Sequence, residues 1–502
     1  MSNLEKILSK IVKYGLYAIL LTPLVFWPRA LYAFMTPKFI LFQVLVEIVF
    51  GAWILLAILN KEYRPKFSWL TTALISFTVI SLISALFGVD LARSVWGIGA
   101  RMTGLFAELH FFAWFLVLVS YFKNDRKEWN RYINFSFAVT ILVALSAFYQ
   151  NPQWRLVPGY TIFSNPTFVA PYFLFHFFWG LYQIWNSQSW QKLYYVSASA
   201  LILWAIFLGQ IRGAFIGLFL GILFLGAGLI FSNIFKVRSR VLIAVLYAII
   251  VLSLVLGWQF RDSKFVEQSY FSRFSRISFE EATVQTRFLT WQAASKGFYD
   301  KPLLGVGPEN FNYLFNAHYN PRLLMYGGSS FAETWQDKPH NAFIEILTET
   351  GIIGSLAYIS IWLFVVFYLF RIFKRGPSAQ AGDKFLLLVL AGAFISYLGT
   401  IFFSFDSFGS WFGLYLMLGF LASHNNANNT NYHANDTNKS FFKNIFMLFV
   451  CVGLFVLLYI NYGIWRANLA DADALRIFSR DQIQGIAYFK KSLDYFTPYK
   501  AE

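Results

Sequence analysis

Long, nearly uncharged apolar segments constrain the fold of this chain more than any other feature. The segments LFQVLVEIVFGAWILLAIL and AVLYAIIVLSLVLGW contain one charged residue and none, respectively. Each approaches the roughly 20 residues that an α-helix needs to cross the hydrocarbon core of a bilayer. Hydrophobic residues fill 58% of the 502 positions and charged residues 13%, a balance that soluble domains rarely show. The sequence therefore predicts an all-α polytopic membrane protein.

About 12–13 transmembrane helices are expected, together with one large external loop that contains short helices. The first apolar segment has no small-residue cleavage site, so we predict a retained span and not a cleaved signal peptide. The predicted spans lie near residues 14–34, 39–59, 69–88, 104–122, 132–149, 166–186, 194–210, 213–232, 241–258, 341–370, 385–403, 410–423 and 443–464.

Lysine and arginine in the short loops predict the orientation of these spans. The N-terminus carries Lys6, Lys10 and Lys13, and alternate loops such as NKEYRPKFS and KNDRKEWNR are rich in cations. Because cytoplasmic loops hold the excess of Lys and Arg, we expect a cytoplasmic N-terminus and an external C-terminus. This bias explains most of the net charge of +16, so no nucleic-acid partner is expected.

The spans divide the chain into four predicted regions. Residues 1–258 form an N-terminal transmembrane bundle of about nine helices, and residues 259–340 form an external loop domain. Residues 341–464 supply the remaining transmembrane helices, and residues 465–502 form an external helical tail. The tail has small residues at helical intervals and resembles one tetratricopeptide-like hairpin. Such a hairpin cannot bury a core alone, so it needs the outer loop, the membrane, a protein partner or further repeats to pack against.

Four arginines break the charge rule because they lie in loops that the topology places outside. Arg93, Arg101 and Arg155 lie in outer loops, and Arg212 lies where two spans approach the outer face. Cations there gain nothing from topology, and burial near lipid costs a few kcal/mol. Each could snorkel to lipid headgroups, but together they suggest a site for an anionic ligand.

The outer loop also has an internal pattern. Arg287, Trp291 and Ala294 recur at helical spacing, which predicts a short amphipathic helix on the membrane surface. The segment DKPLLGVGPENF then interrupts the helix with two prolines and two glycines. Gly305 and Gly307 lack the third glycine of a dinucleotide-binding motif, so we expect a tight turn where the backbone approaches substrate or another helix.

His340 stands at the entrance of the span that closes this loop. Pro339 precedes it, and Glu345 and Glu349 lie in the first turns of the span. The partial positive charge of a helix N-terminus disfavours imidazolium. A neutral imidazole at the water–lipid boundary can accept a proton, as a general base must. The alternative is an interfacial histidine that only tops the helix.

Three sequence elements resemble the O-antigen ligase family and its Wzy-type polymerase relatives. They are Arg212-Gly-Ala, the Arg287-x-x-x-Trp helix followed by KPLLGVGPENF, and His340-Asn341 followed by ETGIIG. The segment GYTIFSNPTFVAPYF before a span is similar to a further family element. The resemblance covers roughly residues 90–420 and does not separate ligases from polymerases or protein O-oligosaccharyltransferases.

The resemblance implies a glycosyltransferase that moves a glycan from an undecaprenyl-diphosphate carrier to an acceptor such as lipid A core, another glycan or a protein. It implies the bacterial inner membrane, with the active site on the periplasmic face. His340 would be the base, and Arg212 and Arg287 would clamp the diphosphate, since Arg grips phosphate in a bidentate manner. Arg155, Arg101, Arg93 and Asn341 would bind substrate. Asp471-x-Asp473 is the one Asp-x-Asp pair and lies in the tail, so we expect a metal-independent reaction without cofactors. The resemblance implies that the reaction inverts the anomeric carbon.

Two other classes of function remain open from the residues. A polysaccharide flippase or transporter would use ionisable groups within the spans, but no internal repeat of the kind such folds show is present. A non-catalytic scaffold would explain the helical tail but not the outer arginines. The ionisable groups that would form an ion path are Glu47, Glu108, His110, His176 and Asp406.

Overall fold

The computed structural model describes residues 2–66, 68–148, 161–232, 234–260, 263, 281–326, 335–373, 381–425, 440–478 and 480–499, and all regular elements within them are helical. The elements are α1 (Asn3–Ile19), η1 (Thr22–Leu24), α2 (Thr36–Leu59), η2 (Lys61–Tyr63), α3 (Trp69–Leu86), α4 (Leu91–Trp96), α5 (Leu105–Phe122), α6 (Arg126–Leu145), η3 (Ser146–Phe148), α7 (Pro166–Asn186), α8 (Ser189–Gly209), α9 (Arg212–Phe231), α10 (Val237–Gln259), α13 (Ala282–Asp300), α14 (Phe311–Ala317), α15 (Leu323–Tyr326), α16 (Ala342–Phe373), α17 (Ala381–Ile401), α18 (Phe408–Asn425), α19 (Ser440–Phe478) and α20 (Gln482–Leu493).

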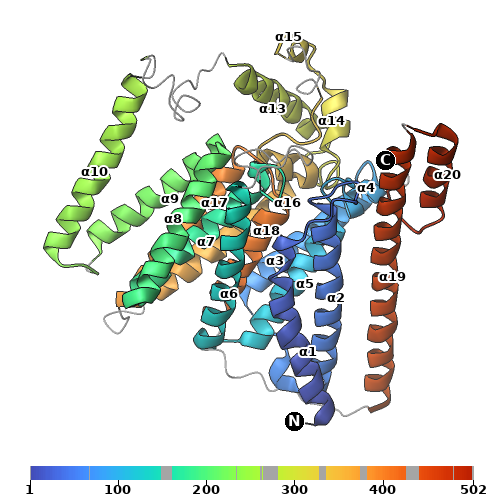
Figure 1. Cartoon of the computed structure of the whole chain (residues 1–502), viewed down its shortest axis with the longest axis horizontal. Helices are drawn as coiled ribbons and strands as arrows, with labels where there is room; N and C mark the ends of the chain where they lie inside the picture. The colour runs from blue at the N-terminus through green and yellow to red at the C-terminus, as the bar shows by residue number, and fades with distance from the viewer. Residues whose placement is uncertain are drawn as a thin grey trace.

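The predicted all-α polytopic membrane fold is confirmed. Ten helices of the described residues are long and apolar enough to cross a membrane. Helices α7, α10 and α18 occupy three further predicted spans and are 21, 23 and 18 residues long. Most of the long helices form one bundle, while α10 extends away from it at the edge of the view (Figure 1).

The predicted position of the first span, residues 14–34, is wrong. Helix α1 begins at Asn3, where the Ser2 hydroxyl accepts a hydrogen bond from the backbone of Glu5, and it ends at Ile19. Pro23 is the second residue of the short turn η1, and proline cannot continue the hydrogen-bonded ladder of the preceding helix. The apolar residues after Leu24 therefore belong to the connection to α2 and not to the first span.

Small residues bring α9 and α17 into close contact. Gly213, Gly217 and Gly221 recur every four residues and line one face of α9. A side-chain carbon on Gly217 would lie 2.2 Å from the carbonyl oxygen of Ser396, so only glycine permits this approach. Membrane helices associate through such stripes because lipid provides no hydrophobic drive between them. This packing sets where Arg212, the first residue of α9, stands.

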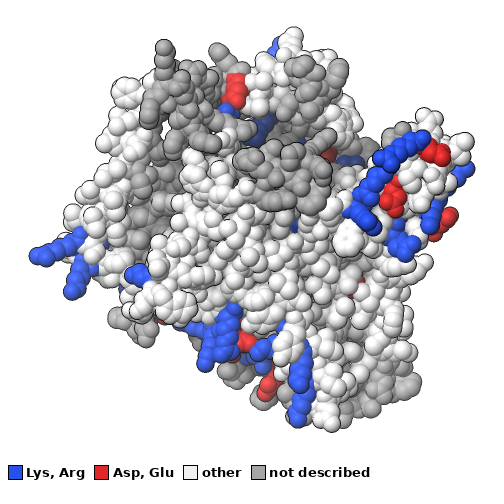
Figure 2. Space-filling model, viewed as in Figure 1, with Lys and Arg blue, Asp and Glu red and all other residues white. Residues whose placement is uncertain are grey.

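Helices α4, α13, α14 and α15 cover one end of the bundle, and the N-terminus lies at the other (Figure 1). We call the first end the loop end. A small core of its own stabilises it, in which Ala293 and Ala294 of α13 pack with Phe311 and Phe315 of α14. Lys and Arg gather near the end with the N-terminus and on the α19–α20 hairpin (Figure 2).

The C-terminal tail is continuous with the last span. Helix α19 runs for 39 residues, so the expected border after residue 464 falls inside it. Its last turns pack against α20, and a side-chain carbon on Gly485 would lie 2.7 Å from Phe478. The Asn468 side chain accepts a hydrogen bond from the backbone of Leu31, and Trp465 contacts Trp27. The hairpin thus packs on the connection between α1 and α2.

Candidate active site

His340 lies at the loop end, two residues before α16. Its backbone is left-handed, with φ of 54°, a conformation that costs about 1–2 kcal/mol for an L-residue. Asn341 follows it, and the Asn341 side-chain oxygen accepts hydrogen bonds from the backbone of Phe343 and Ile344. Asn341 therefore caps α16 in this structure, and its side chain is buried.

One contact determines the tautomer of His340. The Nδ1 atom lies 3.2 Å from the carbonyl oxygen of Lys338. A carbonyl can only accept a hydrogen bond, so Nδ1 carries the proton and Nε2 keeps a lone pair. Burial and the positive charge of Arg287 lower the pKa of His340 from 6.5 to about 4. The ring is therefore neutral at physiological pH.

Helix α13 brings Arg287 to the imidazole. The indole N–H of Trp291, one turn after Arg287, donates to the carbonyl of Pro339 at 2.8 Å. This bond ties α13 to the residue before His340. The predicted helix around Arg287 and Trp291 is thus confirmed, and it joins the loop domain to the start of α16.

Arg101 approaches His340 from another element. Its guanidinium pairs with Asp337 and lies 5.3 Å from the ring centre of Phe405. The His340 ring packs edge-on against the same Phe405, with 5.4 Å between ring centres. We call His340, Arg287, Arg101, Asp337 and Phe405 the His340 cluster.

Arg212 lies beside this cluster and not within it. Its guanidinium donates to a carboxylate oxygen of Glu281 at 2.7 Å. Glu281 directly precedes α13, so Arg212 is joined to the helix that carries Arg287. Both side chains of the pair are partly exposed, at 25% and 30%.

The remaining predicted substrate-binding arginines have different surroundings. The Nε–H of Arg93 donates to the backbone carbonyl of Glu309 at 2.7 Å, which joins α4 to the loop before α14. Arg155 lies outside the described residues.

The sequence did not predict a buried group of charged residues beneath the His340 turn. The ammonium of Lys338 lies 2.7 Å from Glu309, 2.5 Å from Glu345 and 3.7 Å from Glu349. We call these four residues the Lys338 cluster. The two acids at the start of α16 were the available signal, since carboxylates entering a span need a partner. The lysine and Glu309 could not be assigned to them from spacing.

The turn that places Glu309 beside Lys338 requires glycine at two positions. Gly305 and Gly307 have φ of 68° and 95°, and the N–H groups of Val306 and Gly307 donate to the carbonyls of Thr348 and Glu349. A side-chain carbon on Gly305 would lie 2.4 Å from the backbone of Glu349. The predicted tight turn is therefore confirmed, and the backbone that it approaches is that of α16.

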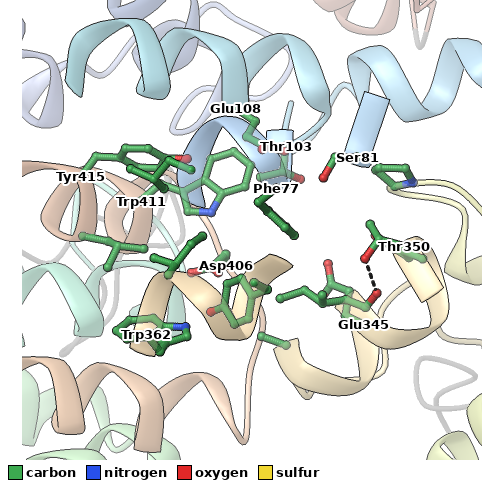
Figure 3. A pocket seen from close by; sticks show the side chains of 18 of the residues that line it. Phe77, Ser81, Thr103, Glu108, Glu345, Thr350, Trp362, Asp406, Trp411 and Tyr415 are labelled. Carbon is green, nitrogen blue, oxygen red and sulfur yellow. Dashed lines mark hydrogen bonds between the residues drawn. The ribbon is translucent and has the colours of Figure 1, made fainter. Parts of the chain in front are cut away.

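A cavity of about 100 Å³ lies next to the Lys338 cluster. Glu108, Thr103 and Ser81 face it from one side, and Glu345 and Asp406 face it from the other (Figure 3). Aromatic side chains including Trp362, Trp411 and Tyr415 complete its wall. The volume suits a few water molecules better than a sugar.

The ionisable groups within the spans form separate hydrogen-bonded groups. Glu47 bonds with His110 and Asn461, and Glu108 bonds with Thr78. His176 bonds with Ser136, and both carboxylate oxygens of Asp406 accept from Tyr397. Glu108 and Asp406 face the same cavity, whereas Glu47, His110 and His176 do not line it. The five groups therefore do not share this cavity.

Part of the sequence is similar to a known protein family. A family model described as O-Antigen ligase matches residues 197–359, which include Arg212, Arg287 and His340. The resemblance to the O-antigen ligase family is confirmed. The matched residues of this O-antigen ligase-like chain run from α8 into α16, and Arg93 and Arg101 lie before them.

The sequence is also similar to a protein that is named for a biosynthetic process. The chain is 26% identical over 266 residues to the teichuronic acid biosynthesis protein TuaE of Bacillus subtilis (strain 168). The match covers 51% of this chain, and the chain spans about half the length of that relative. Among the described residues of the O-antigen ligase-like chain, no group of three or more His, Cys, Asp and Glu side chains is arranged to hold a metal ion. Metal independence stays a prediction.

Proposed function

We propose that this protein transfers a glycan from an undecaprenyl-diphosphate carrier to an acceptor hydroxyl or amine. The observation that carries the proposal is the neutral His340 imidazole, with Nδ1 protonated and two arginines at its sides. A base that keeps its lone pair near cations suits a reaction in which an acceptor loses a proton beside an anionic leaving group. The family match includes His340 and Arg287 but not Arg101, and it supports this chemistry.

The proposed step is a direct displacement. The acceptor oxygen attacks the anomeric carbon, and its proton passes to Nε2 of His340. The bond between that carbon and the diphosphate oxygen breaks, and the diphosphate leaves with the bonding electrons. Arg287 and Arg212 hold the developing charge in bidentate contacts, so the configuration inverts without a covalent intermediate.

Arg212 must exchange partners for this role. In the structure it pairs with Glu281, and in the proposed complex a phosphate oxygen would replace this carboxylate. Arg101 is likewise paired with Asp337, so we assign it to the neighbourhood of the acceptor and to the electrostatics of His340. Arg93, Arg155 and Asn341 are proposed to support substrate binding less directly than Arg212 and Arg287.

A polymerase is the second candidate. The named process of the Bacillus relative, teichuronic acid biosynthesis, favours transfer of a growing glycan onto another lipid-linked repeat unit. The base and the clamp would be the same, and only the acceptor would differ from that of a ligase.

The test is transfer by purified protein in lipid nanodiscs. A defined undecaprenyl-diphosphate glycan is supplied with lipid A core, a second lipid-linked unit, an acceptor peptide or a cell-wall polymer, with and without a chelator. We expect one acceptor to be glycosylated with inverted anomeric configuration and no effect of the chelator. Retention of configuration would contradict direct displacement, and failure with all donors would contradict the function.

The proposed periplasmic position of the site has its own test. Cys451 is first replaced by serine, and single cysteines are then introduced at Met325 on the loop end and Ala381 at the start of α17. Both side chains are exposed. A membrane-impermeant thiol reagent added to intact cells should label position 325 and spare position 381. The reverse pattern would contradict both the orientation and the mechanism.

A further inference from the structure

The backbone and side chain of Lys338 make contacts on two sides of the turn before α16. Its carbonyl accepts the hydrogen bond from Nδ1 of His340, and its ammonium enters the Lys338 cluster. The side chain is only 4% exposed. Moving this residue would therefore change the partner of the imidazole and the packing beneath it together.

The cluster joins four parts of the molecule. Glu309 accepts from the Thr103 hydroxyl at 2.8 Å, and its own N–H donates to Glu349 at 2.9 Å. Lys338 bridges this loop residue to Glu345 of α16. The ammonium thus holds the loop before α14, the segment before α5 and the first turns of α16 around one point.

The charges of the cluster require a cation at this position. Three buried carboxyl groups face one ammonium, and three of their oxygens, one each in Glu309, Glu345 and Glu349, have no hydrogen-bond partner. Removing the ammonium would leave buried carboxylates uncompensated, which is strongly unfavourable. Burial alone would lower the pKa of Lys338, but Glu309, Glu345 and Glu349 raise it far above its ordinary value. The side chain is therefore charged at any pH at which the protein works.

The turn itself needs an external support. His340 has a left-handed backbone, which is stable only when its neighbours hold it. Asn341 holds one side through the cap of α16, and Pro339 is held by Trp291. Lys338 is the residue of the turn that is fixed through buried ion pairs.

We propose that Lys338 is a positioning residue that fixes the tautomer and orientation of the His340 imidazole. The role rests on the proposed function, in which Nε2 of His340 is the base. The Gly305–Gly307 turn contributes to this positioning, because it places Glu309 beside the ammonium of Lys338. A misplacement of about 1 Å in such a base can lower the rate about 10²-fold.

The test combines a spectroscopic and a kinetic measurement on the full chain in lipid nanodiscs. Protein labelled with ¹⁵N at histidine is examined by NMR, and the His340 signals are assigned by their loss in His340→Gln. The wild type should show the Nδ1–H tautomer of His340. Lys338→Met should show a mixture of tautomers, a kcat about 10²-fold lower and little change in KM for the lipid-linked donor. Lys338→Arg, which keeps the charge, should recover part of kcat.

Two further variants complete this test, one as a control and one as a substitute if Lys338→Met does not fold. Lys296→Met removes an exposed lysine of α13 and should leave both measurements unchanged. Lys338→Met combined with Glu309→Gln removes a positive and a negative charge, and serves if the single variant does not fold. An unchanged tautomer and an unchanged kcat in a folded Lys338 variant would overturn the proposal. If the wild type transfers no glycan, the proposed function fails, and the tautomer measurement still decides the role of Lys338.

Discussion

His340 and Lys338 are two residues apart, yet their surroundings carry opposite charge. His340 is half-buried, and its burial together with the positive charges of Arg287 and Arg101 keeps the imidazole neutral. Lys338 is buried among Glu309, Glu345 and Glu349, which keep its ammonium charged. We propose that the anionic substrate binds in the first environment, where two arginines face the imidazole. The second is closed and compensates its charge internally, so its role is to hold the turn.

The comparison predicts the largest effect at His340 itself. His340→Ala should lower the turnover of glycan transfer about 10²–10⁴-fold, because the acceptor would lose its base. Binding of the lipid-linked donor, measured by retention of radiolabelled donor on nanodiscs, should persist because the arginines remain. Near-normal turnover would leave His340 as a residue that only precedes the helix.

The arginines should come next and should respond to geometry as well as to charge. Arg287→Lys and Arg212→Lys are each expected to cost about 2–4 kcal/mol of transition-state stabilisation, roughly 30- to 1000-fold in kcat/KM. Lysine keeps the charge but loses the bidentate fork. The double variant should lose less than the sum of the two, because both residues hold one leaving group.

Arg131→Lys provides the control for these substitutions. Arg131 lies on α6 in an exposed pair with Glu128 and should tolerate lysine. Strictly additive losses for Arg212 and Arg287 would mean that they serve separate tasks, and the clamp would then be sought at Arg101 and Arg155.

The pH dependence of activity distinguishes the effect of the Arg287 charge on the pKa of His340 from the effect of its guanidinium geometry on the rate. A neutral His340 is the active form, so activity should persist on acidification and fall only as the pH approaches the pKa of about 4. Arg287→Gln removes a positive charge that lowers this pKa, so the acid limb of the kcat/KM profile should move to higher pH. Arg101 and Asp337 also face the ring and stay in place in this variant.

Arg287→Lys keeps the charge and should leave the acid limb near its original position while lowering the rate. The pH profiles of these two variants test the His340 cluster alone, since neither substitution alters a residue of the Lys338 cluster. An acid limb near pH 6.5 in the wild type would contradict the electrostatic description of His340.

The smallest expected effect concerns the pairing of Arg212. Glu281→Gln should lower KM for the lipid-linked donor by up to about five-fold, because a partly exposed ion pair is worth about 0.2–1 kcal/mol. Glu62→Gln alters an exposed pair with Lys123 at the other end of the bundle and should have no effect. A higher KM after Glu281→Gln would show that Glu281 assists donor binding and does not compete with it.

Much of the candidate site could be predicted because its members violate local rules. Arginines in loops that should lack cations and a histidine at a helix entrance are visible in the chain itself. The structure brings Arg287, Arg101 and His340 together and leaves Arg212 one ion pair away, while Arg93 bonds to the loop backbone. The Lys338 cluster was missed because no local pattern pairs this lysine with Glu309, which lies 29 residues earlier in the chain.

The sequence by itself determined the class of the fold and the approximate position of most spans, because a bilayer demands long apolar helices and each helix satisfies its own backbone. It also determined the tight turn at Gly305 and Gly307. Only the tertiary structure decided that Glu281 pairs with Arg212 and that Glu309 reaches Lys338. Arg101 and its partner Asp337 are 236 residues apart. Such contacts depend on how whole helices pack, and no local pattern encodes the position of a partner that distant in the chain.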